Sequence, residues 1–123
     1  MTNAEREKNT EIIKETIAYL EARGYEEIKS PIEGYEAPKS YRKAGENISV
    51  TPDIVAVRNG IKHYFEIGLK SDEPSLLKSK WQFLKMLSQM KNRRFKVITH
   101  RGHYRFTDEL LQDLNLENNL IRI

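Results

Sequence analysis

Asp53 and Glu66 are the two residues whose types and spacing point most directly to chemistry. Two runs of β-branched and aromatic residues flank Asn59-Gly60, which is the strongest short sequence signal for a two-residue hairpin turn. A turn there places Asp53 directly opposite Glu66 on one face of the hairpin, with the two Cβ atoms about 5 Å apart. Like charges in that position weaken a sheet unless a cation, a shared proton or a basic side chain offsets the repulsion.

The pair of carboxylates is therefore a candidate metal site. Two oxygen ligands from neighbouring strands, with water in the remaining positions, suit Mg²⁺ (or Mn²⁺). The chain has no cysteine, so a bound metal must use oxygen or imidazole ligands. The alternative interpretation is two solvated acids at the open end of the hairpin, splayed apart or paired with Lys62 and Lys70. If the acids repel each other without metal, replacing both with amides would raise the stability of the protein.

The two faces of this hairpin differ in composition, because alternate residues of a strand point to opposite faces. One face is apolar and consists of Ile54, Ala56, Ile61, Phe65, Ile67 and Leu69. The other face consists of Asp53, Val55, Val57, Tyr64, Glu66, Gly68 and Lys70. This second face is apolar near the turn and charged at its far end, which predicts a helix over the turn end and a site at the rim of the sheet.

Length and composition limit the class of protein. A chain of 123 residues is long enough for one domain and too short for two ordinary ones, so we expect a single domain over residues 1–123. A hydrophobic fraction of 38% and a charged fraction of 32% are typical of soluble globular proteins. No apolar run approaches the length of a membrane span, and the first residues do not resemble a signal peptide. We therefore expect a cytoplasmic protein with no membrane partner.

The charges are unevenly distributed along the sequence. Residues 74–107 contain nine Lys and Arg and no Asp or Glu, whereas the first 36 residues contain nine acids and five bases. Concentrated positive charge is the electrostatic signature of a protein that binds a polyanion, so nucleic acid is the expected partner. The residues predicted to contact it are Lys78, Lys80, Arg93, Arg94 and Arg101. The alternative is that the basic stretch neutralises the acidic N-terminal helix.

Apolar periodicity predicts the elements that precede the hairpin. An amphipathic helix is predicted over residues 3–23, with Gly24 as its stop, and a first strand over residues 25–31. Residues 32–47 have no clear period and form a long loop or two short extended pieces. The N-terminal helix must cover one face of the sheet, because its apolar stripe needs a partner surface.

The part of the chain after the hairpin contains two further helices and two further strands. One helix is predicted over residues 75–91, with Trp81 on its buried stripe, and a buried strand over residues 94–100 follows it. Thr107 is predicted to cap a short helix, and residues 118–123 to form an edge strand that could pair in a homodimer. A helix that connects two strands of one sheet makes them parallel. The predicted fold class is therefore α/β, with a mixed central sheet and helices on both faces.

This order of elements, with one acid at the start of the second strand and another on the third, resembles the PD-(D/E)XK nuclease superfamily. Over roughly residues 3–100 the chain looks like the restriction-endonuclease-like αβββαβ core of that family, with Asp53 as the leading acid and Glu66 as the second. The resemblance implies that both acids bind Mg²⁺ and that a lysine two residues after the second acid orients the attacking water. It also implies that the N-terminal helix contributes an acid, either Glu11 or Glu15.

The family's lysine position, two residues after Glu66, is occupied by Gly68 in this chain. Lys70 points to the same face of the strand as Glu66 and is the candidate catalytic lysine. At about 3.3 Å per residue, its backbone starts about 13 Å from Glu66. A glycine within a strand often marks a bulge, which would bring Lys70 closer. In some branches of the family the lysine is on the neighbouring helix, which nominates Lys78 or Lys80.

The leading functional prediction is a metal-dependent nuclease, endonuclease or exonuclease, that hydrolyses phosphodiester bonds of DNA or RNA with Asp53, Glu66 and Lys70. A metal ion supports this chemistry by lowering the pKa of a bound water and neutralising charge on the phosphoryl oxygens. The first alternative is a catalytically degenerate nuclease fold that binds nucleic acid or a protein partner without cleavage. The second is an interaction protein whose acidic pair is incidental.

Overall fold

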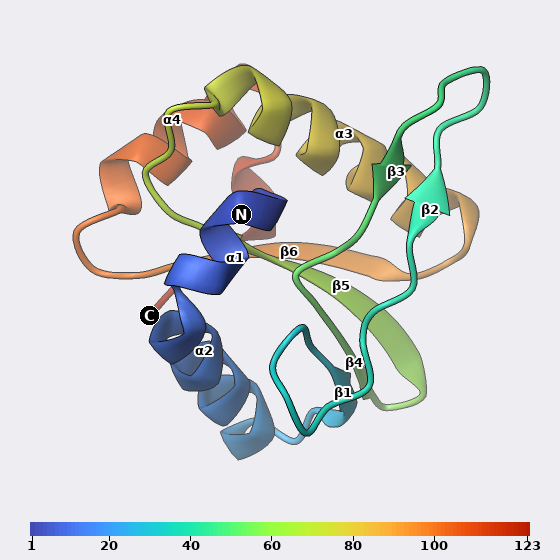
Figure 1. Ribbon diagram of the computed structural model, residues 1–123, viewed down its shortest axis with the longest axis vertical. Helices are drawn as coiled ribbons and strands as arrows, with labels where there is room; N and C mark the ends of the chain where they lie inside the picture. The colour runs from blue at the N-terminus through green and yellow to red at the C-terminus, as the bar shows by residue number, and fades with distance from the viewer.

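A five-stranded mixed β-sheet forms the centre of the computed structural model, which describes residues 1–123 (Figure 1). Its strands are β1 (Glu26–Lys29), β4 (Ile54–Arg58), β5 (Ile61–Gly68), β6 (Arg94–Thr99) and β7 (Leu120–Arg122). They lie in the order β1-β4-β5-β6-β7. Hydrophobic clusters cover both faces of the sheet, and helices contribute to each, which confirms the predicted α/β class with a mixed sheet.

The hairpin of β4 and β5 has the register that its turn predicts. Arg58 pairs with Ile61, and the same register places Asp53 opposite Glu66 at the open end of the hairpin. The two turn residues have positive φ angles of 53° and 75°, as the favoured two-residue hairpin turn requires. The predicted pairing of the two acids is therefore confirmed.

β5 and β6 are parallel, as predicted for strands that a helix connects, and α3 (Pro74–Met90) makes the connection. β7 runs parallel to β6 and forms one edge of the sheet, which confirms the predicted C-terminal edge strand. β7 pairs with β6 only from Val97 to Thr99. The first half of β6 therefore has no strand neighbour on that side.

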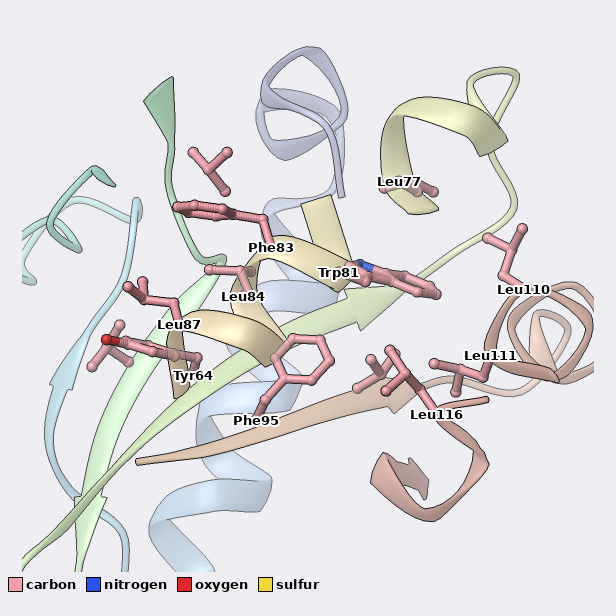
Figure 2. Close-up of a cluster of buried hydrophobic side chains, with 13 residues drawn as sticks. Tyr64, Leu77, Trp81, Phe83, Leu84, Leu87, Phe95, Leu110, Leu111 and Leu116 are labelled. Atoms are coloured by element: carbon pink, nitrogen blue, oxygen red, sulfur yellow. The ribbon is translucent and has the colours of Figure 1, made fainter. Parts of the chain in front are cut away.

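One face of the sheet packs against α3 and α4 (Tyr104–Asp113). Figure 2 shows Trp81 and Leu84 of α3 in the same cluster as Tyr64 of β5 and Phe95 of β6. These side chains are almost completely buried, and burial of an apolar side chain of this size stabilises the fold by about 1.5–3 kcal/mol. Val55 belongs to the same cluster, so the face that is apolar near the turn lies under a helix, as predicted.

The opposite face of the sheet packs against α2 (Thr10–Ala22). Ile13, Ile17 and Leu20 recur at helical spacing along α2 and are buried. Their strand partners belong to the predicted apolar face of the hairpin and are Ile54, Ala56, Phe65, Ile67 and Leu69. The prediction that the N-terminal helix covers one face of the sheet is confirmed.

The N-terminal helical segment is divided into α1 (Asn3–Lys8) and α2, so the prediction of one continuous helix over residues 3–23 is wrong. Asn9 separates the two helices with φ −123° and ψ 35°, and its side-chain amide donates to the Glu5 carbonyl oxygen at 2.7 Å. Asparagine side chains compete with helical backbone hydrogen bonds in this way. Figure 1 shows the consequence, which is that α1 lies over the sheet instead of extending the line of α2.

Thr107 lies inside α4, so the prediction that it caps this helix is wrong. The helix begins at Tyr104, after a turn in which the His103 N–H donates to the His100 carbonyl oxygen. The Thr107 hydroxyl lies 3.0 Å from the hydroxyl of Thr99 on β6. The side chain therefore fixes α4 against the sheet instead of binding a free N–H at the helix end.

Three short elements complete the chain. β2 (Tyr41–Arg42) and β3 (Ser49–Val50) form a separate antiparallel ribbon that projects from the sheet (Figure 1). A 3-10 turn, η1 (Glu117–Asn119), precedes β7. None of the helices combines the length and the apolar character that crossing a membrane requires.

Candidate functional site

Asp53 and Glu66 are both completely buried, with side-chain exposures of 0%. The Asp53 N–H donates to Glu66 Oε2 at 2.8 Å, and the Ile67 N–H donates to Asp53 Oδ2 at 2.8 Å. The interpretation of two solvated acids paired with Lys62 and Lys70 is therefore wrong. Each carboxylate accepts a backbone N–H from the opposite strand, and these hydrogen bonds join the two strands at the open end of the hairpin. They also hold the two side chains in fixed orientations.

The α-ammonium group of Met1 lies between the two carboxylates. It is 2.7 Å from Asp53 Oδ2 and 3.5 Å from Glu66 Oε1, and it donates to the Ile67 carbonyl oxygen at 3.2 Å. The break in the N-terminal helix makes this contact possible, because α1 turns back over the sheet. Three oxygen atoms from the ends of two neighbouring strands therefore surround one cationic nitrogen.

Two further cations contact the acids. Lys80 of α3 places its Nζ 3.0 Å from Glu66 Oε1 and 3.2 Å from Asp53 Oδ1. Arg6 of α1 donates from Nε to Asp53 Oδ1 at 3.0 Å, and its guanidinium also contacts the Thr51 carbonyl oxygen. With Met1, three cationic groups thus surround two carboxylates, which leaves the cluster one positive charge in excess.

Trp81 fixes the second carboxylate. Its indole N–H donates to Glu66 Oε1 at 3.2 Å, and the ring is completely buried under α3. A buried indole N–H needs an acceptor, and the adjacent Lys80 reaches the same oxygen. Residues 80 and 81 of α3 therefore act together on Glu66, one through charge and one through a directed hydrogen bond.

The environment of Asp53 favours its ionised form. Burial alone would raise the pKa of this carboxyl, but the charges of Lys80, the Met1 ammonium and Arg6, with the Ile67 N–H, outweigh that effect. The pKa of Asp53 is therefore held well below its usual range. Asp53 keeps a full negative charge at neutral pH, as a cation ligand must.

The oxygen set at the pair is chemically suited to a hard divalent cation. The Met1 ammonium stands in for a cation that contacts Asp53, Glu66 and the Ile67 carbonyl oxygen. Mg²⁺ is bound by one or two carboxylates and keeps several waters, so this set matches it. The structure contains no group of three or more His, Asp or Glu side chains that could hold a metal. A divalent ion would have to displace the ammonium, because the cluster already has excess positive charge.

The structure does not bring Lys70 to the acids. β5 ends at Gly68 without a bulge in its pairing with β4 or β6, and Lys70 is exposed beyond it, with its N–H donating to His103 Nδ1 at 2.9 Å. Gly68 itself lies tightly against α4. A Cβ added there would be 2.6 Å from two side-chain atoms of Thr107. A lysine cannot occupy the family's position unless α4 moves.

Among the alternatives on the helices, only Lys80 contacts the acidic pair. Lys78 instead forms an ion pair with Asp113 at 2.8 Å. Glu11 is exposed, and Glu15 lies 3.7 Å from His100 Nδ1, so neither helix acid contacts the pair. The N-terminal helices contribute cations to this site where the family resemblance implies an acid.

The basic residues predicted to contact nucleic acid are divided between two parts of the molecule. Arg93 contacts the hydroxyl groups of Tyr64 and Tyr41, and Arg94 is exposed at the start of β6. Arg101 is exposed beyond the other end of that strand. None of the nine Lys and Arg residues between positions 74 and 107 forms a direct ion pair with an acid of α1 or α2.

Comparison of the chain with family models, with curated proteins and with solved structures finds no match. The resemblance to the PD-(D/E)XK superfamily therefore stays a prediction from the sequence. The chemistry of the site has to be argued from the contacts of its own residues.

Sequence analysis missed the contribution of the N-terminus to this site. Thr2 and Glu5 form a capping box, which is a recognisable sequence signature for the start of α1 but does not indicate the break at Asn9. No local pattern relates Met1 to Asp53, because 52 positions separate them. The contacts of Met1 and Arg6 depend on where the tertiary fold places α1.

Proposed function

We propose that Asp53 and Glu66 form the cation-binding centre of a nuclease that hydrolyses phosphodiester bonds of DNA or RNA. The observation that carries this proposal is the convergence of two carboxylates and the Ile67 carbonyl oxygen on a single cationic nitrogen. Completely buried carboxylates are costly unless they are paired, so a site that holds two of them side by side is built to bind positive charge.

Asp53, Glu66 and the Ile67 carbonyl oxygen would hold Mg²⁺ once the Met1 ammonium withdraws. A divalent ion there would lower the pKa of a bound water and neutralise charge on phosphoryl oxygens. Trp81 keeps the Glu66 carboxylate oriented through its N–H. Lys80 supplies a positive charge beside both acids, in a position to stabilise charge that develops on the phosphate.

The electrostatics of the chain support a polyanionic substrate. The formal net charge is +3, and the sequence from 74 to 107 has no acid, so a phosphate backbone would be attracted to α3 and β6. Lys78 and Lys80 lie on α3, and Arg94 lies at the start of β6. These residues are the proposed contacts for the substrate backbone, together with Arg93 and Arg101.

Cleavage assays with two lysine variants test the proposal. Supercoiled, linear, single-stranded and branched DNA and structured RNA are incubated in Mg²⁺ or Mn²⁺ with the parent, Asp53→Asn, Lys80→Met and Lys70→Met. We expect Asp53→Asn to abolish cleavage, Lys80→Met to slow it about 100-fold or more, and Lys70→Met to have a far smaller effect. Cleavage that survives Asp53→Asn would refute the site, and equal effects of the two lysine variants would refute the role of Lys80.

A binding measurement tests the displacement of the ammonium. A Gly-Ser extension before Met1 replaces the charged amine with a neutral amide, while the carboxylates of Asp53 and Glu66 stay in place. We expect Mg²⁺ to bind the extended protein about tenfold more tightly in calorimetric titration, because one competing charge is gone. Unchanged binding would show that the ammonium and the metal do not share a position.

A catalytically degenerate fold that binds nucleic acid without cleavage is the second candidate. Gly68 at the family's lysine position, packed against Thr107, favours it, as do the three cations already present at the acids. In that case Asp53 and Glu66 are the anionic part of a structural ion network. Salt-sensitive nucleic-acid binding, with no cleavage and no Mg²⁺ binding in either the parent or the extended protein, would support this candidate over the nuclease.

A further inference from the structure

Cationic side chains from three parts of the chain approach Tyr41 of β2. Arg93, which precedes β6, donates from Nη1 to the Tyr41 hydroxyl at 3.2 Å. The ammonium groups of Lys39, before β2, and Lys91, at the end of α3, lie 5.7 and 5.9 Å from the centroid of the Tyr41 ring. Tyr41 is half-buried, and both lysines are exposed. We call Tyr41 with these three cations the tyrosine cluster.

Tyr64 of β5 fixes the Tyr41 hydroxyl from the interior of the protein. The Tyr64 side chain is completely buried. Figure 2 shows its hydroxyl at the edge of the apolar side chains, and this hydroxyl donates to the Tyr41 hydroxyl at 3.3 Å. The Arg93 guanidinium contacts the Tyr64 hydroxyl as well. Burial, followed by the hydrogen bond to Tyr41, raises the pKa of Tyr64 to about 12, so Tyr64 keeps its proton at neutral pH and remains a donor.

The Tyr41 hydroxyl has a proton that no atom of the protein accepts. A tyrosine hydroxyl can donate one hydrogen bond and accept others, and the Tyr41 oxygen accepts from both Arg93 and Tyr64. The proton is therefore directed away from these two residues. Burial would raise the pKa of Tyr41, but the hydrogen bonds from Tyr64 and Arg93, with the charges of Arg93 and Lys62, lower it. A more acidic hydroxyl is a stronger hydrogen-bond donor to an anion.

The three cations of the tyrosine cluster have no anionic partner in the protein. None of them forms an ion pair with a carboxylate, whereas Lys43 in the same ribbon pairs with Glu46. The C-terminus of α3 favours a nearby cation, which accounts for Lys91 but not for Lys39. The ring attracts both ammonium groups, but distances near 6 Å are at the outer limit of a cation–π interaction, which neutralises no charge. The cluster therefore combines uncompensated positive charge with a free hydroxyl donor.

We propose that the tyrosine cluster binds phosphate in the backbone of a nucleic-acid strand. A phosphate oxygen accepts the hydrogen bond from Tyr41 while the cations offset its charge. Three positive charges from separate segments suit successive phosphates better than a single carboxylate. Proteins that bind single strands combine a cationic track with aromatic side chains, as this cluster does. The inference rests on the substrate class of the proposed function but not on hydrolysis, because no residue of the cluster contacts Asp53 or Glu66.

Binding measurements without divalent metal test the tyrosine cluster separately from hydrolysis. The probes are one oligonucleotide as a single strand, the same sequence as a duplex, and a polyglutamate peptide as a polyanion without phosphate. Tyr41→Phe removes only the hydroxyl of the cluster. Lys39→Gln with Lys91→Gln removes its two exposed charges.

The matched controls change the same residue types at other exposed positions. They are Tyr35→Phe, in the loop before β2, and Lys8→Gln with Lys14→Gln, on the N-terminal helices. We expect the controls to change the affinity for every probe by less than about twofold. Any larger and specific loss in the cluster variants is then due to the position of the changed residues and not to the change in composition or net charge.

We expect Tyr41→Phe and the double lysine variant each to weaken oligonucleotide binding about tenfold, because each loses charge-assisted contacts with phosphate. The affinity of the double lysine variant should also depend less on salt, with a logarithmic slope smaller by about 2. A loss confined to the single strand and a loss shared with the duplex both support a backbone site, and they tell the two forms of substrate apart.

Equal weakening by the cluster variants and the controls would overturn the proposal, as would a loss for polyglutamate as large as the loss for oligonucleotides. If Tyr41→Phe does not fold, the double lysine variant decides alone, since its two changes are at exposed positions. Cleavage that depends on Asp53 can fail while these binding differences persist, and it can persist while they fail. The two proposals are therefore tested independently.

Discussion

The acidic pair and the two basic residues at the start of β6, Arg94 and Lys96, both place like charges near each other, and they differ in how those charges are balanced. At the acidic pair, three cations from distant parts of the chain contact two completely buried carboxylates. At the start of β6, Arg94 and Lys96 lie on the same face of the sheet as His63, and neither forms an ion pair with a carboxylate. One region is compensated inside the protein, whereas the other has no ion pair within the protein.

This difference determines which existing interactions each region loses when an ion binds to it. A divalent ion at Asp53 and Glu66 must displace the Met1 ammonium, so its binding free energy is reduced by the loss of existing ion pairs. An anion that approaches Arg94 or Lys96 displaces no carboxylate. Burial strengthens the ion pairs of Asp53 and Glu66. Exposure to solvent weakens any interaction of Arg94 and Lys96 with an anion, because salt screens it.

The largest expected effect comes from removing the charge of both acids. Asp53→Asn with Glu66→Gln leaves the charges of Met1, Arg6 and Lys80 without anions in a buried site. We expect a loss of about 3–5 kcal/mol in the free energy of unfolding by urea denaturation. This reverses the expectation from sequence alone, in which relief of repulsion would stabilise the double variant.

A surface control isolates the role of burial in that experiment. Glu7→Gln with Glu11→Gln removes two negative charges from exposed positions and should change stability by less than about 0.5 kcal/mol. If the buried double variant were as stable as this control, internal compensation of the acidic pair would be refuted.

The contact between β5, which carries Glu66, and α4 is tested by adding a side chain at Gly68. Gly68→Ala places a Cβ 2.6 Å from Thr107, and we expect the overpacking to reduce stability by about 1–3 kcal/mol. Thr107→Ala in the same chain should recover part of that loss, because the two residues are in direct contact. Urea denaturation of the two single variants and the double variant measures this coupling, and strictly additive losses would contradict the close contact.

The pH dependence of stability should distinguish the internally paired acid from ordinary surface acids. Because the pKa of Asp53 is lower in the folded than in the unfolded protein, its contribution is fully present above about pH 4 and is lost as the pH falls further. The difference in unfolding free energy between the parent and Asp53→Asn should therefore stay constant from pH 7 to pH 5 and narrow towards pH 3. A difference independent of pH down to pH 3 would show that the Asp53 charge is not stabilised by its partners.

The smallest effect is expected at Arg94 and Lys96. Arg94→Gln with Lys96→Gln removes charges that have no partner, so stability in chloride should stay constant or rise by less than about 1 kcal/mol. Replacing chloride with phosphate at equal ionic strength should raise the melting temperature of the parent more than that of the variant. A variant that loses stability in chloride would show that these cations are compensated by groups within the protein.

Local patterns were sufficient to predict the framework of this molecule. Asn59-Gly60 fixes the hairpin turn, and the turn determines the register that pairs Asp53 with Glu66. Helical spacing identified α3, and its connection to β6 required that strand to run parallel to β5. The alternation of residues along the hairpin strands assigned each residue to one of the two faces of the sheet. These features depend on residues close together in the sequence, or on the handedness of a single connection.

The composition of the candidate site depended on contacts that have no local signature. The break at Asn9 redirects α1, and only the folded arrangement brings Met1 and Arg6 to Asp53. The choice of Lys80 over Lys70 depends on the rotation of α3 about its axis and on where β5 ends.

The amino-acid sequence by itself thus determined the sheet, its register and the opposition of two acids, because backbone geometry links each of these to short-range patterns. Only the tertiary structure decided that those acids are internally neutralised and that the cations near β6 are not. The physical reason is that the electrostatic energy of a charge depends on burial and on neighbours within a few ångströms. Such neighbours come from segments whose separation along the chain carries no information about their distance in space.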